Sequence, residues 1–367
     1  MASGVVQLAV SLMTGLVFGY AVEKSRVFEP RSIRNQFIYS RFIMMKMFLS
    51  ALTTSIVCFC FLSTIPMTRK YFTRIRNGYM SCLTRKGVLM SVCGGVMLGA
   101  GMALAATCPG IVLAQIGTLV PNSSYCLAGC FFGVFLYALT DSSLTKYFET
   151  SPSKEQTKPI DVYLGIPYPV LGVTMAILTS SVVFVIELLF PWQTEIEGLN
   201  LGNEGSLMSQ RAWPPYLAGT LIGALQVPVS LLVGDTLGGS QSYCTLLSQM
   251  LVIKKLQRKL PYLMQYRHGV ENWWQVLFVS GAVGGAYFSA VSSSSLGLAV
   301  GIAPSSAFLG GTLMLYGARM AGGCTSGHGL SGFGLMMALS MVAVPAMFGG
   351  GTAMGFLIHY LGNESLL

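Results

Sequence analysis

Apolar runs long enough to cross a bilayer recur along the whole chain. A bilayer core needs about 20 apolar residues per helix, and nine segments meet this requirement. The pattern therefore predicts an all-α integral membrane protein rather than a soluble domain with one anchor. The predicted spans are 4–22, 42–65, 88–107, 124–140, 168–190, 214–234, 272–293, 304–322 and 335–358.

Four further segments are too short or too broken to span, and each opens with Pro, Gly or small polar residues. Such residues stop or start helices, so we expect short half helices here. These segments lie near 28–40, 109–119, 236–250 and 326–334.

The order of long and short segments repeats. Residues 1–140 form a first membrane repeat, and 214–367 form a second one with the same order. The linkers at 141–213 contain one connecting span, 168–190. Four spans followed by one connecting span put the second repeat on the opposite side of the membrane. The sequence thus predicts an inverted repeat, in which secondary transporters place the substrate site at the repeat interface.

A sequence motif in the third span of each repeat supports this relation. The pattern GG-x5-G-x3-A-x2-C runs from Gly94 to Cys108 and again from Gly310 to Cys324. A shared G-x-x-x-G in the first spans is weaker, because small residues at this spacing are common between packed helices in lipid. The longer match predicts that Cys108 and Cys324 lie at equivalent positions near the twofold axis.

Charge and composition narrow the partners. Only 10% of the residues are charged, against roughly 25% in soluble proteins, and the mean hydropathy is +0.64. The net charge of +9 comes from short basic stretches between apolar runs, so we expect a lipid bilayer and no nucleic acid as partner. The loop 67–86 carries six Lys or Arg, which predicts a cytoplasmic amino terminus. We expect a multi-pass protein of the plasma membrane. The stretch 23–46 also carries six and opposes this orientation.

The most informative stretch is GARMAGGCTSGHGLSGFG, from Gly317 to Gly334. Glycine at this density ends a helix and exposes backbone amides. Thr325 and Ser326 suit the N-cap of a short helix, whose free N–H groups attract an anion without a full counter-charge. The stretch therefore predicts an anion site from which the anion can also be released.

The first repeat has a matching stretch, Thr107-Cys108-Pro109-Gly110. Pro is favoured in the first turn of a helix, so each repeat presents a cysteine where a short helix begins. A thiol is a weak, polarizable donor that suits a soft sulfur atom better than hard oxygens. Two thiols at equivalent positions predict a path for a sulfur-containing anion.

The stretch AGGCTSGHG at 321–329, preceded by Gly317 and Arg319, resembles the signature of the YeeE/YedE sulfur-transport family, the thiosulfate transporters. The resemblance extends over the nine-span layout and implies an hourglass-shaped protein that relays thiosulfate between central cysteines, among them Cys108 and Cys324. A third cysteine usually follows the first span, but Phe28 stands there in this chain. Cys244 is a candidate replacement.

Several other residues have two interpretations each. Arg319 either attracts the anion or braces the glycine loop by pairing with its carbonyls and Asp235. His328 either donates to the substrate or is bonded within its own turn. Glu29 is expected to cap the short helix after it, and Met44–Met47 to pack in the core or face lipid. Gly327 completes the candidate substrate-binding set, which is Thr107, Cys108, Cys244, Arg319, Cys324, Thr325, Ser326, Gly327 and His328.

Three functions remain open. The first is a transporter of a thiosulfate-like anion, and the second is a pore for another small anion or neutral solute. The third is a membrane sulfur-delivery protein, in which a cysteine persulfide passes sulfur to a carrier protein. The sequence shows no nucleotide-binding loop, metal-ligand cluster or Ser-His-Asp arrangement, so we expect neither an enzyme nor a bound metal or cofactor.

Overall fold

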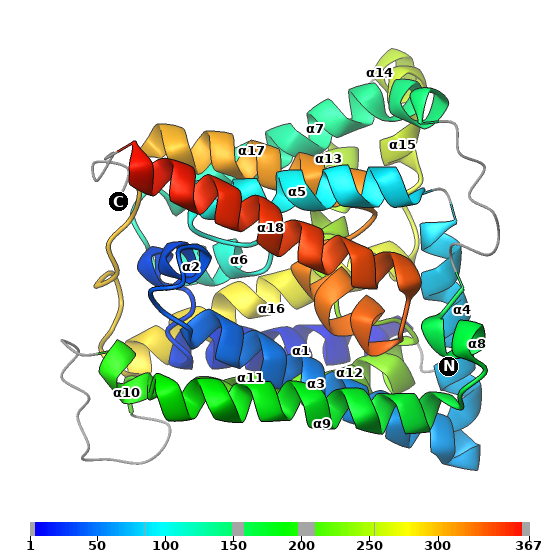
Figure 1. Cartoon of the computed structure of the whole chain (residues 1–367). Helices are drawn as coiled ribbons and strands as arrows, with labels where there is room; N and C mark the ends of the chain where they lie inside the picture. The colour runs from blue at the N-terminus through cyan, green and yellow to red at the C-terminus, as the bar shows by residue number, and fades with distance from the viewer. Residues whose placement is uncertain (1–3, 85, 149–157, 197–209, 253, 362–367) are drawn as a thin grey trace.

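The chain folds as an all-α protein, as the apolar pattern predicts (Figure 1). The computed structural model describes residues 4–84, 86–148, 158–196, 210–252 and 254–361, and these residues form helices and no β-strand. Among them, eight helical segments are long and apolar enough to cross a membrane. They are α1 (Gly4–Lys24), α3 (Ile43–Thr64), α5 (Val88–Ala105), α7 (Ser123–Tyr147), α9 (Tyr168–Leu189), the segment Pro215–Val233, α16 (Val270–Ser292) and α18 (Ala338–Tyr360).

The predicted span at 304–322 is also a helix, α17 (Pro304–Ala321), which packs against α5 and α7. It is as long as α5 but less apolar, so nine full spans stay a prediction. The segment Pro215–Val233 is not one regular helix. It divides into α11 (Pro215–Ala224), α12 (Gln226–Pro228) and the π-helical turn η1 (Val229–Val233). Pro228, which has no N–H to donate, lies at this break.

Short helices are present where the sequence predicts half helices. The helices α2, α6, α13 and the π-helical segment η2 lie between two layers of long helices (Figure 1). One layer contains α5, α7, α17 and α18, and the other contains α1, α3, α9, α11 and α16. The short elements are α2 (Pro30–Phe37), α6 (Ile111–Gly117), α13 (Gln241–Gln249) and η2 (Thr325–Gly332).

Glycine allows the two motif helices, α5 and α17, to touch backbone to backbone. A Cβ at Gly101 would meet the backbone of Met314 and Gly310, and a Cβ at Gly317 would meet that of Leu98 and Gly94. The two sets of contacts are equivalent, because each residue of one set corresponds by position to a residue of the other set in the second copy of the motif. The packing therefore supports the predicted relation between the repeats.

The basic stretch 67–86, expected to be a loop, is mostly helical. It forms α4 (Pro66–Leu83), which buries only Phe72, Ile75 and Leu83 and is otherwise largely exposed. The expectation was wrong because a Pro at the first position starts a helix here, and charged residues are compatible with a largely exposed helix. The remaining linkers contain α8 (Ile160–Leu164), α10 (Trp192–Glu195), α14 (Lys254–Lys259) and α15 (Pro261–Met264); residues 149–157 and 197–209 lie outside the described part.

Lys46 is a buried cation within the spanning helix α3. Its side chain is fully buried in α3, and its Nζ atom lies 2.9 Å from Glu187 and 2.8 Å from Glu195. A buried cation needs such partners. The two ion pairs join α3 to α9 and α10, which gives Glu187 a structural role.

Other basic residues of 23–46 are also buried and bonded. Arg26 pairs with Glu23 and Glu29, and Lys24 donates to the Gln210 carbonyl. The sequence predicts that Glu29 caps α2, but its side chain makes no capping bond there. These cations are engaged inside the protein and are not free at the membrane surface. When these buried cations are left out, the end with the amino terminus and α4 carries more exposed basic residues than the opposite end (Figure 1). This favours a cytoplasmic position for that end.

This orientation is testable with a native cysteine. Cys82 on α4 is exposed, whereas the other eight cysteines are buried or half-buried. A membrane-impermeant maleimide should therefore label inside-out vesicles strongly and intact cells weakly, and Cys82→Ser should remove the signal. Strong labelling of intact cells that disappears in Cys82→Ser would reverse the orientation.

The helix contact is testable with two glycines of spanning helices. Gly101→Ala inserts a methyl group against backbone, and overpacking of this kind costs about 1–3 kcal/mol. Gly349→Ala in α18 is the matched control, because a Cβ there meets nothing within 4 Å. We expect a lower melting temperature for Gly101→Ala alone in detergent. Equal melting temperatures for the two variants would show that α5 and α17 do not need this contact.

Candidate functional site

The two predicted cysteines lie in turns of the same construction. Helix α5 ends at Ala106 with φ 48°, and α17 ends at Gly322 with φ 91°, both in the left-handed region. Cysteine follows two residues later in each case. The Cys108 carbonyl accepts a hydrogen bond from the Val112 N–H (3.0 Å), and the Cys324 carbonyl accepts one from the His328 N–H (2.8 Å). Each cysteine thus stands where a short helix, α6 or η2, begins.

Backbone amides and hydroxyls surround the Cys108 sulfur. The N–H groups of Gly110 and Ile111 and the Thr325 hydroxyl lie close to it, and all four residues line one cavity. Thr325 follows Cys324 directly in the chain, so this proximity brings the two cysteine turns together at one place. Consecutive Cα atoms are only 3.8 Å apart, which keeps the two cysteines well within the roughly 20 Å that a shared central site allows.

The Cys324 sulfur has a similar environment. It lies 3.2 Å from Ser326 Oγ, and the Ser240 hydroxyl and the N–H groups of Gly239 and Gly327 are close by. Both thiols are at least nine-tenths buried. The polar groups next to each sulfur are thus neutral donors, which is the arrangement expected for weak, reversible anion binding.

The predicted N-cap role of Thr325 and Ser326 is wrong. The N-cap residue of η2 is Cys324, and it makes no side-chain capping bond. The Ser326 hydroxyl bonds to the Cys324 thiol instead, and the Thr325 hydroxyl lies close to the Cys108 thiol. Thr107, also predicted for the site, is fully buried, and its hydroxyl turns back to the Cys108 carbonyl at 3.5 Å.

His328 is bonded within its own turn. Its ring is fully buried, with Nε2 lying 3.2 Å from the Ala321 carbonyl and Nδ1 lying 2.9 Å from Ser340 Oγ. A carbonyl only accepts, so Nε2 carries the proton and Nδ1 accepts from the Ser340 hydroxyl. His328 is therefore arranged as a neutral brace between η2 and the helices on either side. The Gly327 carbonyl is fixed in the same way, by the Tyr79 hydroxyl at 2.8 Å.

Arg319 is buried, and its guanidinium donates to hydroxyl groups. Nε donates to Tyr262 (2.7 Å), Nη2 to Tyr266 (3.0 Å) and Nη1 to Ser240 (3.4 Å). The expected pairing with loop carbonyls and Asp235 was wrong: Asp235 binds the Thr236 N–H and the Trp274 ring instead. Since Ser240 also lies close to Cys324, its hydroxyl stands between the arginine and the thiol.

Cys244 lies away from the two described cavities. Its side chain is fully buried beside the Tyr262 hydroxyl and Arg319 and lines neither cavity. Phe28 is buried against the Arg26 guanidinium, 4.8 Å from its ring centre, and lines neither described cavity. The position that carries cysteine in the resembled pattern is therefore a packing position in this chain.

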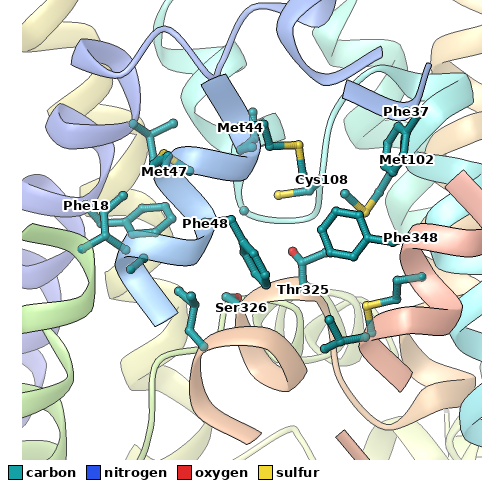
Figure 2. Close-up of a pocket in the computed structure, with 18 residues that line it drawn as sticks. Phe18, Phe37, Met44, Met47, Phe48, Met102, Cys108, Thr325, Ser326 and Phe348 are labelled. Atoms are coloured by element: carbon teal, nitrogen blue, oxygen red, sulfur yellow. The ribbon is translucent and has the colours of Figure 1, made fainter. Parts of the chain in front are cut away.

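An apolar cavity ends at the cysteine turns. Figure 2 shows Cys108, Thr325 and Ser326 facing the same space as Met44 and Met102. The cavity encloses about 60 Å³, room for several water molecules. Its other walls come from the ends of α1 and α5 and the start of α3, at the α2 end of the molecule (Figure 1). We call this cavity the vestibule.

The vestibule borders the hydrophobic core and continues inward. Met44 and Met47 are buried in the core, as expected, and also line the vestibule. A smaller second cavity lies beyond, bounded by the loop at 237–239 and by Phe278 on α16. Phe18, Gly110, Ser326 and Leu330 border both cavities, so they form the partition between them.

Several supporting residues had no recognised signal in the sequence. The Tyr243 hydroxyl donates to the Pro109 carbonyl (2.8 Å) and holds the Cys108 turn. Arg34 donates to the carbonyls of Ala103 (3.4 Å) and Leu104 (3.2 Å) at the end of α5.

Lys86 has the same role at the end of α17 in the second repeat. Its Nζ atom donates to the Arg319 carbonyl (3.1 Å). Ala103 and Arg319 are equivalent positions in the two motif copies. The equivalence of these two positions is present in the sequence, but the cation that binds each carbonyl can be identified only from the fold.

Comparison with known proteins agrees with this arrangement. The sulphur transport family matches residues 24–353, which includes both cysteine turns and both motif copies. No curated protein shows significant similarity to the chain. A match over this length, on a chain with eight membrane-spanning helical segments in its described part, is decisive. The chain belongs to the sulphur transport family.

Proposed function

We propose that this membrane protein takes up a small sulfur anion resembling thiosulfate and passes it from Cys108 to Cys324. The observation that carries the proposal is the meeting of the two cysteine turns through Thr325, at the inner end of a cavity that starts near α2. A thiol at this end offers a soft sulfur partner. The Gly110 and Ile111 amides add donors without a net charge.

The neutral surroundings of the thiols explain how the anion leaves. A fixed, desolvated Arg or Lys at the vestibule would hold a dianion strongly, because Coulomb attraction grows in low dielectric. Amides and hydroxyls bind more weakly and are already oriented, so little reorganisation accompanies each transfer. Thr325 lies close to Cys108 and directly follows Cys324, so it connects the two proposed binding positions.

Arg319 is proposed to draw the anion onward. It lies beyond Cys324, within reach of Ser240, and Ser240 touches both groups. Its three donors are held by three hydroxyls and by no carboxylate among the ion pairs of the described residues. Its positive charge is therefore directed toward an arriving anion. The inverted repeat would place this step on the cytoplasmic side.

Uptake by reconstituted vesicles tests the role of the thiols. Cys108→Ala or Cys324→Ala should abolish uptake of labelled thiosulfate, because each change removes one soft donor. The loss of stability should be only about 1 kcal/mol, the size of a typical single substitution. Ser should rescue poorly, since a hydroxyl is a harder partner for sulfur.

The matched control is Cys93→Ala, a half-buried thiol of α5 outside the site. It should leave uptake near wild type. Wild-type uptake by the Cys108→Ala, Cys324→Ala double mutant would show that the thiols only pack, and a pore for another small solute would then be the better account.

A second set of variants tests Arg319. The Arg319 guanidinium donates hydrogen bonds to Tyr262, Ser240 and Tyr266, and a lysine ammonium cannot reproduce the geometry of these three bonds. We therefore expect Arg319→Lys to lose nearly as much uptake as Arg319→Ala, with both proteins still eluting as folded monodisperse species. Strong uptake by Arg319→Lys would indicate a simple charge attraction. Near-normal uptake by both would remove Arg319 from the mechanism.

A further inference from the structure

The vestibule wall is apolar to an unusual degree for an anion pathway. Four methionines, Met44, Met47, Met102 and Met347, line it together with phenylalanine and aliphatic side chains. No charged side chain is among the described residues of this wall. Its polar side-chain groups are the thiol and the two hydroxyls at the inner end, shown together in Figure 2.

Two cations close in sequence to this wall are engaged elsewhere. Lys46, next to Met47, is paired with Glu187 and Glu195. Arg34, on the short helix that contributes Phe37 to the wall, donates to carbonyls at the end of α5. An anion inside the vestibule therefore loses water without meeting a charged side chain of the wall.

This order of events discriminates between anions. Removing an ionised oxygen from water without a partner is costly, and sulfate presents oxygen in every direction. A sulfur terminus is polarizable, and contacts between sulfur and aromatic or thioether groups are favourable. An anion with such a terminus can advance sulfur-first along the wall while its oxygens still face the water behind it.

We propose that the vestibule selects its substrate by dehydration: it admits anions with an exposed sulfur terminus and excludes oxyanions that lack one. The leading sulfur then meets the Cys108 thiol, and the following oxygens meet the Thr325 and Ser326 hydroxyls. This inference rests on the proposed transport function but adds a substrate class to it. Thiocyanate, a small anion with a sulfur terminus, belongs to the class, and sulfate does not.

The test compares uptake of labelled thiosulfate, thiocyanate and sulfate by vesicles with and without the protein. We expect protein-dependent uptake of the first two and at least about tenfold less of sulfate, a ratio that corresponds to roughly 1.4 kcal/mol. Equal uptake of thiosulfate and sulfate would overturn the selection by dehydration while leaving the transport function intact. Uptake of thiocyanate without thiosulfate would contradict the proposed thiosulfate transport while leaving the selection by dehydration intact. Uptake of none of the three anions would contradict both proposals.

Two substitutions at one wall position test the cause. Met102→Leu keeps the wall apolar, and Met102→Gln places an amide of similar length in it; Met47 offers a second site for the same pair. The Gln variants should admit relatively more sulfate, and the Leu variants should keep the wild-type ratio. The ratio does not depend on how much protein folds. An unchanged ratio in both Gln variants, or an equal loss of selectivity in the Leu variants, would overturn the proposal.

Discussion

The interior of a bilayer offers no water to an unpaired backbone amide, so a helix that breaks there depends on protein groups for its hydrogen bonds. The breaks after α5 and α17 meet this constraint in one way. A left-handed residue closes each helix, and the carbonyls of Met102 and Ala318 each accept two N–H groups from the turn. The amides that follow are then free to point at a sulfur atom. The site is a consequence of how the two helices end.

The same constraint explains the buried cations. Carbonyls at a helix end carry partial negative charge, which would repel an approaching anion. Arg34 binds such carbonyls on α5, and Lys86 binds the equivalent one on α17. Their charge is used to neutralise helix ends and not to hold the substrate. Neutral donors therefore remain next to the thiols, and the cation Arg319 lies beyond Cys324.

Much of the fold was predictable because apolar periodicity and helix-breaking residues are local signals. The positions of the long helices, of the four short elements and of the two cysteine turns all follow from them. The residues around the turns do not, because they depend on which helix faces which. Met44 and Met47 read as ordinary apolar residues until α3 is placed beside the cysteine turns. Tyr243, in the string Ser242-Tyr243-Cys244, was overlooked in favour of its neighbouring thiol, which instead lies beside Arg319.

The central claim is that a sulfur anion binds where the two cysteine turns meet. An experimental density map of the purified protein with thiosulfate would test it most directly. We expect density for two linked sulfur-sized atoms between the Cys108 thiol and the hydroxyls of Thr325 and Ser326, absent from a map recorded without the anion. Ordered thiosulfate elsewhere, with the cysteine turns unoccupied and unchanged, would contradict the account.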